Sequence, residues 1–167
     1  MASIANIINK NKTLFGETHL NTPEYILSKI QEQDISFILN SICRIHTDTD
    51  IKNSESLIIN YNYFKYFATP ATYEIIMQHT INNIDTVLQS KPSFVIHLNM
   101  RGLTISQLDK HKQYLCYVST VFKDKYPDTL GTCFVYDAPF IFSRLYDIVG
   151  FFVDKITLNK IQVVNKI

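Results

Sequence analysis

The chain has 167 residues, of which 46% are hydrophobic and 19% are charged, and its formal net charge is +1. This length and apolar content suit one globular domain with a substantial core. A balance so close to neutrality excludes the strongly basic surface that nucleic-acid binding needs, so we expect no nucleic-acid partner.

The cysteines and the N-terminal residues indicate the compartment. Cys43, Cys116 and Cys133 are far apart and form no Cys-x-x-Cys pair. This favours a reducing environment over a disulfide scaffold. Residues 1–12 lack the apolar run of a signal peptide, and no stretch reaches the roughly 18 apolar residues of a membrane span. We therefore expect a cytoplasmic protein.

The N-terminal part is expected to be a loose arm followed by short helices. Residues 1–22 are polar and show no periodic pattern. Thr22 followed by Pro23 predicts a helix start, and Asp34 predicts the cap of a second short helix. The polar stretch 46–56 predicts a loop.

The rest of the chain alternates between apolar runs and helical patterns. Strands are predicted over 57–61, 94–98, 132–136 and 160–164, and helices from Pro70 to Leu88, over 106–125 and over 139–154. This order predicts an α/β fold with a mainly parallel sheet covered by helices. We divide the chain into an arm with short helices at 1–50 and one α/β unit at 51–167.

Residues 60–67 carry an unusual density of aromatic side chains. In an extended segment Tyr61 and Tyr63 would share one side, with Phe64 and Tyr66 on the other. Two interpretations stay open at this point. The group forms an aromatic mini-core with exposed phenol tips, or it forms part of the wall of an apolar pocket.

The patterns typical of most enzymes are missing. The sequence has no glycine-rich phosphate loop and no Gly-x-Ser-x-Gly element, and none of its five histidines pairs with another histidine or a cysteine at metal-ligand spacing. We expect no catalytic residue, no metal and no cofactor. His97 lies in an apolar strand and is interpreted as a buried, hydrogen-bonded histidine.

The segment 140–153 is apolar nearly all round when drawn as a helix. Only Ser143, Arg144, Asp147 and Gly150 interrupt it. A surface helix normally shows a single apolar stripe. The segment is therefore an ordinary central helix buried on two sides, or one of its faces meets a second apolar partner, which would be core, protein or lipid.

Three stretches share the order and spacing of a known family. Residues 94–103 form an apolar strand running into Asn99-Met100-Arg101-Gly102, similar to an Asp-x-Lys/Arg-Gly motif. Residues 126–131, Tyr-Pro-Asp-Thr-Leu-Gly, are similar to Tyr-Pro-Glu-x-x-Gly, and residues 151–161 are similar to Pro-Phe-Leu-Asp-x-x-Thr-x-x-Lys-Ile. Together they resemble the CRAL-TRIO family, the domain of phosphatidylinositol and tocopherol transfer proteins.

The resemblance implies a mixed, mainly parallel sheet that forms the floor of an apolar cavity, closed by a mobile helix at about 139–153. It assigns ligand headgroup roles to Asp128 and Lys160, although a turn residue and a charge at a strand start are the plain alternatives. The cavity or gate residues implied are Phe140, Phe142, Leu145, Val149 and Phe152.

This sequence also departs from the family pattern. Asn99 and Asp137 stand where the family usually has Asp and Asn, and the chain stops at Ile167, whereas family members continue past this strand. A shallower cavity, a cavity covered by a partner subunit, and a lost lipid function are the alternatives that follow.

The sequence thus leads to a ranked set of functions. The first is the binding, and potentially the transfer, of a hydrophobic ligand such as a phospholipid, with transient membrane contact. The second is a protein-interaction or regulatory module on the same scaffold without a cavity, potentially a homodimer. An enzyme is the least favoured reading.

Overall fold

The computed structural model describes the chain except for residues 1–14, 16–21, 49–53, 141, 152 and 165–167. A five-stranded sheet forms its centre, made of β1 (Cys43–Asp48), β2 (Ser54–Asn60), β3 (Phe94–Asn99), β4 (Leu130–Tyr136) and β5 (Ile161–Val163). The strands lie in chain order, with β1 antiparallel to β2 and all later pairs parallel. This confirms the predicted mixed, mainly parallel α/β fold.

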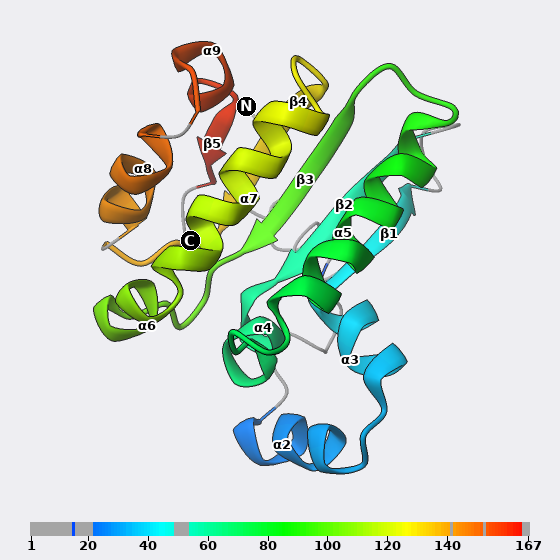
Figure 1. Ribbon diagram of the computed structural model, residues 1–167, viewed down its shortest axis with the longest axis vertical. Helices are drawn as coiled ribbons and strands as arrows, with labels where there is room; N and C mark the ends of the chain where they lie inside the picture. The colour runs from blue at the N-terminus through cyan, green and yellow to red at the C-terminus, as the bar shows by residue number, and fades with distance from the viewer. Residues whose placement is uncertain (1–14, 16–21, 49–53, 141, 152, 165–167) are drawn as a thin grey trace.

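Helices fill every connection between the parallel strands. Because successive parallel strands are neighbours, right-handed crossovers bring their helices to the same face of the sheet. In Figure 1, α5 and α7 lie over that face. The connecting helices are α4 (Tyr61–Phe67), α5 (Tyr73–Leu88), α6 (Ile105–Lys110), α7 (Lys112–Lys125), α8 (Phe142–Gly150) and α9 (Lys155–Leu158).

Strand register decides which side chains face these helices. Ile59, Leu98 and Val135 are aligned across β2, β3 and β4, and the alternation of strand side chains puts them on the helix-covered face. The aligned set one residue earlier, Ile58, His97 and Phe134, lies on the opposite face. There Ile58 and Tyr136 form a second small cluster with Phe15, whose ring centroid is 5.2 Å from that of Tyr136.

The two N-terminal helices begin where the sequence predicts. The Thr22 hydroxyl accepts a hydrogen bond from the Tyr25 amide at the start of α2 (Pro23–Gln31). The Asp34 carboxylate accepts one from the Phe37 amide at the start of α3 (Ile35–Ile42). Each cap satisfies an amide that the first helical turn leaves without a partner. Apart from Phe15 and Thr22, the predicted arm at 1–22 lies outside the described residues.

Two local predictions are wrong. Residues 46–48 and 54–56 belong to the β1–β2 pair, although the polar sequence predicts a loop there; residues 49–53 lie outside the described part. Residues 61–67 are helical, because the Asn60 side chain caps a helix by accepting from the Asn62 amide at 3.2 Å. The weak conformational preference of a short segment is overridden by such a cap or by hydrogen bonding to a neighbouring strand.

Two predicted helices differ from those in the structure, one by an interruption and the other by its length. The one over 106–125 is interrupted at His111, where α6 ends and α7 begins. The one over 139–154 starts at Phe142 and ends at Gly150, and Asp154 then caps α9 by accepting from the Thr157 amide at 2.7 Å. A residue that caps one helix has non-helical dihedrals and so cannot continue the preceding one. Among the described helices, none has both the length and the apolar character needed to cross a membrane.

The division of the chain at residue 50 stays a prediction. The first strand of the sheet already begins at Cys43 and pairs with β2 along its whole length. His97 behaves as expected for a core histidine, since it is buried and its Nδ1 lies 2.7 Å from the Tyr136 hydroxyl.

Candidate functional site

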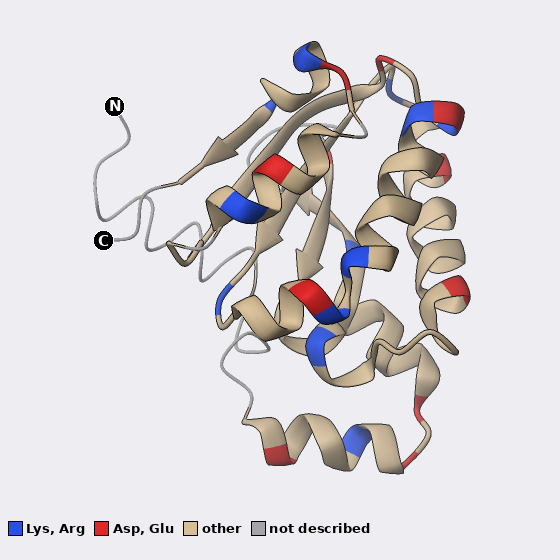
Figure 2. Ribbon diagram, turned by 60° about the vertical axis from the view of Figure 1, so that its left-hand side comes forward, with Lys and Arg blue, Asp and Glu red and all other residues tan. Residues whose placement is uncertain are grey.

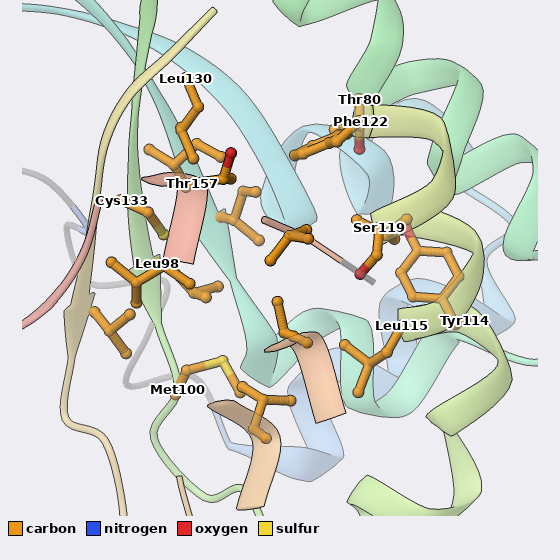
Figure 3. Close-up of a pocket in the computed structure, with 18 of the residues that line it drawn as sticks. Thr80, Leu98, Met100, Tyr114, Leu115, Ser119, Phe122, Leu130, Cys133 and Thr157 are labelled. Atoms are coloured by element: carbon orange, nitrogen blue, oxygen red, sulfur yellow. The ribbon is translucent and has the colours of Figure 1, made fainter. Parts of the chain in front are cut away.

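An apolar cavity of about 520 Å³ lies between the sheet and the helices that cover it. Its floor is the helix-covered face of the sheet, including Ile59, Leu98 and Val135. Helix α7 contributes Leu115 and Phe122 to the opposite wall, and Figure 3 shows these side chains across the space from Leu98 and Cys133 of the sheet and from Met100, which directly follows β3. Helices α5 and α8 supply the remaining sides.

The lining follows directly from the sequence pattern. Strand residues of one alternation and helix residues at three- and four-residue spacing all turn inward, so every wall is mainly hydrocarbon. Cavities of roughly 300–1,000 Å³ with such walls are typical of sites for small apolar molecules. The arrangement can therefore exclude water from a hydrophobic molecule held between sheet and helices.

Side-chain hydrogen bonds fasten α5 to α7. At one end the Tyr73 hydroxyl lies 2.8 Å from Nδ1 of His111. At the other end the Tyr126 hydroxyl donates to Oδ1 of Asp85 at 2.5 Å, and Lys125 forms a salt bridge with the same carboxylate at 3.0 Å. These contacts hold two walls of the cavity at a fixed separation.

The two predicted headgroup residues both line the cavity. Asp128 precedes β4 and Lys160 precedes β5, so both lie where parallel strands begin, at one edge of the sheet. Asp128 is exposed and has a φ of 59°, in the left-handed region that aspartate tolerates better than most residues. Lys160 is partly buried. The salt bridges among the described residues are Lys29–Glu32 and Lys125–Asp85, so Asp128 and Lys160 do not neutralise each other.

Two further charged residues lie at this edge and were missed in the sequence. Lys123, in the last turn of α7, and Asp154 both line the cavity. Lys123 lies four residues after Ser119, whose side chain faces the cavity. This spacing puts both residues on the same side of α7, and it was the sequence signal for Lys123. Asp154 is already committed to the α9 cap, and the hydrogen bonds it accepts, chiefly from the Thr157 amide, lower the pKa of its carboxyl.

The predicted gate residues divide into three groups. Phe142 and Leu145 are buried and line the cavity, and Val149 lines it while partly buried. Phe140 is 91% exposed and is not part of the cavity wall. Phe152 lies outside the described residues. Only part of the apolar circumference of α8 therefore faces the cavity.

The aromatic segment contributes to the wall at the opposite edge of the sheet. Tyr61 and Phe64 line the cavity, whereas Tyr63 is fully buried and packs edge-on against Phe37, 6.2 Å between ring centroids. Because residues 61–67 form a helix, Tyr61 and Phe64, three residues apart, share the face toward the cavity, and Tyr63 lies on another face. The segment thus serves both as a pocket wall and as core.

Thiol and metal chemistry find little support at this site. Cys43 and Cys133 line the cavity, and burial raises the pKa of the first to about 11 and of the second to about 12. Both therefore remain protonated thiols at neutral pH, which are poor nucleophiles. No group of three or more His, Cys, Asp or Glu side chains in the described part of the chain is arranged to hold a metal ion.

Comparison with known proteins identifies the scaffold. Residues 39–167 match the family model described as the CRAL/TRIO domain. The chain belongs to the CRAL/TRIO domain family. The match covers every strand of the sheet and all the cavity-lining elements, and it agrees with the resemblance predicted from three short stretches.

Individual relatives are distant. The chain is 27% identical over 66 residues to the Sec14 cytosolic factor of Schizosaccharomyces pombe, which is 40% of this chain and 23% of that protein. It is 25% identical over 108 residues to the SEC14 cytosolic factor of Yarrowia lipolytica, which is 65% of this chain and 20% of that protein. The chain thus spans about a fifth to a quarter of these curated relatives.

A solved structure shares the fold. The crystal structure of Sfh5 superposes with a TM-score of 0.63 at 14% identity, covering 98% of this chain and 65% of that one. The structural similarity therefore covers more of the chain than the family-model match at residues 39–167.

Proposed function

We propose that this CRAL/TRIO domain binds a hydrophobic lipid-like molecule in the cavity between the sheet and α5, α7 and α8, and exchanges it with membranes. The observation that carries the proposal is the cavity of about 520 Å³ with its almost wholly hydrocarbon lining. The family, one of lipid-binding and lipid-transfer proteins, supports it. The role is one of binding, without catalysis, in the cytoplasm.

The size of the cavity favours a ligand with a single chain or a fused ring system. Its volume lies within the range of about 300–1,000 Å³ that is usual for sites of small apolar ligands. Each methylene taken from water into the cavity contributes about 0.8 kcal/mol. A phospholipid with two long chains needs more room, which an outward movement of α8 would provide.

The charged edge of the cavity suits a polar headgroup. We propose that Lys160 binds a phosphate or another anionic group, with Lys123 adding positive charge, while Asp128 accepts hydrogen bonds from headgroup hydroxyls. The positions of Asp128 and Lys160 shortly before β4 and β5, where both line the cavity, support these roles.

Membrane contact is proposed for the surface around α8. Phe140 and Phe151 flank this helix and are 91% and 87% exposed, and Ile156 on α9 is 68% exposed. Large exposed apolar side chains beside a helix of the cavity wall are suited to insertion among lipids. Charges of both signs are interspersed along the helices in Figure 2, so apolar contact, more than a basic patch, would anchor the protein.

The same exposed side chains favour one alternative. A protein partner, or a second copy of the chain, would also cover Phe140, Phe151 and Ile156. In that case the domain is an interaction module, and the cavity remains empty.

Native mass spectrometry after incubation with phosphatidylcholine vesicles that contain palmitic acid tests the proposal. The wild-type chain should acquire one lipid adduct, and Leu98→Trp, which fills the middle of the floor, should acquire almost none. Gln162→Trp, on the opposite face of the sheet, is the matched control and should bind as the wild type does. A wild-type chain that stays free of lipid, with a dimer mass, would instead support the interaction module.

A further inference from the structure

The end of the cavity farthest from Asp128 and Lys160 holds polar groups without partners. Among the residues that the structure describes, four buried side-chain polar atoms have no hydrogen-bond partner. Three of them belong to residues that line the cavity: the Tyr61 hydroxyl, Oε1 of Gln107 and Nε2 of His111. Buried polar atoms normally have partners, and leaving one unmade costs about 1–3 kcal/mol.

These three side chains gather in one place. The rings of Tyr61 and His111 both pack against Phe64, with centroid distances of 6.2 and 5.0 Å. Gln107 lies one helical turn before His111, whose amide donates to the Gln107 carbonyl at 3.1 Å. The cluster belongs to α4 and α6, which follow the C-terminal ends of β2 and β3, whereas Asp128 and Lys160 precede β4 and β5. The two polar regions therefore lie at opposite edges of a sheet whose strands are about 17 Å long for six residues.

The hydrogen-bonding capacity of the cluster defines the group it suits. The Tyr61 hydroxyl can donate, Gln107 Oε1 can only accept, and His111 Nε2 does either according to the tautomer that the Tyr73 hydroxyl selects at Nδ1. Burial first, and the neighbouring charge of Lys110 second, lower the pKa of His111, which keeps the imidazole neutral. A neutral group that both donates and accepts suits this cluster, and a hydroxyl is the smallest such group that a hydrophobic ligand can carry, whereas a carboxylate or an ester carbonyl cannot donate.

We propose that Tyr61, Gln107 and His111 form an internal subsite that binds the hydroxyl of a neutral lipid alcohol, with its hydrocarbon extending along the cavity toward Lys160. This inference rests on the proposed binding of a hydrophobic ligand. It adds the chemical class of that ligand and the direction in which the ligand lies in the cavity. In this subsite the ligand hydroxyl accepts a hydrogen bond from the Tyr61 hydroxyl and donates one to Oε1 of Gln107.

The test compares two probes that differ in one hydrogen-bond donor. Phosphatidylcholine vesicles carrying 1-hexadecanol or its methyl ether are incubated with the full chain, and uptake is measured by native mass spectrometry over a range of probe concentrations. The wild type should bind the alcohol about tenfold more tightly than the ether, because one buried hydrogen bond is worth about that factor.

Three variants locate the preference. Tyr61→Phe and Gln107→Leu each remove one polar group and should reduce the alcohol-to-ether ratio to below twofold, with binding of the ether unchanged. Tyr63→Phe is the matched control: Tyr63 lies on α4 like Tyr61 and is fully buried, but it does not line the cavity, so the ratio should remain tenfold. Thermal unfolding of each ligand-free variant verifies folding.

The outcomes separate this inference from the proposed function. Equal binding of alcohol and ether by the wild type overturns the hydroxyl subsite and leaves the lipid-binding function standing. A ratio that falls in Tyr63→Phe but not in Tyr61→Phe or Gln107→Leu overturns the location. Failure of the wild type to take up either probe, or palmitic acid, overturns both proposals.

Discussion

The Tyr126 hydroxyl donates a 2.5 Å hydrogen bond to Oδ1 of Asp85 and so connects the end of α7 to the end of α5. Together with the contact between Tyr73 and His111 at the other ends of these helices, it fixes two walls of the cavity relative to each other. Tyr126 also belongs to the Tyr-Pro-Asp stretch, so one short motif both braces a wall and places Asp128 at the cavity edge.

Removing this brace should lower stability in a pH-dependent way. Partial burial by itself raises the pKa of Asp85, but the hydrogen bonds from Tyr126 and Lys125 outweigh it and the pKa is lowered. A lowered folded-state pKa gives stability that is present above the unfolded value of about 3.9 and is lost as the pH falls through the folded value. Tyr126→Phe should therefore cost about 1 kcal/mol at pH 7 and progressively less below about pH 4.

Urea unfolding from pH 7 down to pH 3 measures this difference. Tyr117→Phe is the control, because its hydroxyl donates to the exposed Glu74 carboxylate at 3.0 Å and exposed pairs contribute little. A constant difference between wild type and Tyr126→Phe across the whole range would exclude Asp85 as the titrating partner.

The charge of Lys160 should matter for anionic ligands only. Lys160→Gln removes the cation that lines the cavity edge, so lysophosphatidylinositol should bind about tenfold more weakly, in line with a charge-assisted hydrogen bond. Monopalmitoylglycerol, which has no charge, should bind as before. Competition binding with both lipids checks this.

Lys155→Gln supplies the comparison for that experiment. Lys155 is exposed on α9, five residues from Lys160, and does not line the cavity. Equal losses in Lys155→Gln and Lys160→Gln would indicate a general electrostatic effect of the surface and contradict the headgroup role.

The exposed phenylalanines beside α8 should govern membrane association. Replacing Phe140 and Phe151 together with Ser removes two large apolar side chains that are 91% and 87% exposed. Since each fully buried aromatic contributes about 1.5–3 kcal/mol, even partial insertion predicts at least a tenfold loss of vesicle binding. Co-sedimentation with phosphatidylcholine vesicles measures it.

A double variant on α2 tests whether any exposed apolar residue would do. Tyr25 and Leu27 are 43% and 44% exposed, and replacing both with Ser should leave sedimentation unchanged. If this variant loses vesicle binding as strongly as the α8 variant, the contact surface lies elsewhere.

The three thiols should differ sharply in reactivity. Burial raises the pKa of Cys43 to about 11 and of Cys133 to about 12, so very little thiolate exists at pH 8, whereas Cys116 is only partly buried on α7. Iodoacetamide should therefore label Cys116 in the native chain and all three cysteines in urea. Peptide mapping by mass spectrometry reads this out, and rapid native labelling of Cys133 would show that the floor of the cavity opens to water.

The sequence by itself determined the alternation of β2 to β5 with the longer helices between them, and the family. Helix caps at Thr22 and Asp34 are local, since a side chain bonds an amide three residues away, and the apolar strand runs are local patterns too. The three family-like stretches are also contiguous in sequence, which is why the fold class could be predicted from them.

Only the tertiary structure decided what faces the cavity. Gln107 and His111 are one helical turn apart, but no spacing rule relates them to Tyr61, and strand order and helix packing bring the three together. The β1–β2 pair over polar residues also depends on contacts that sequence patterns do not encode. Phe140 and Phe142 have the same side chain two positions apart, yet Phe140, which precedes α8, is exposed, whereas Phe142 at the start of α8 is buried because it packs into the core.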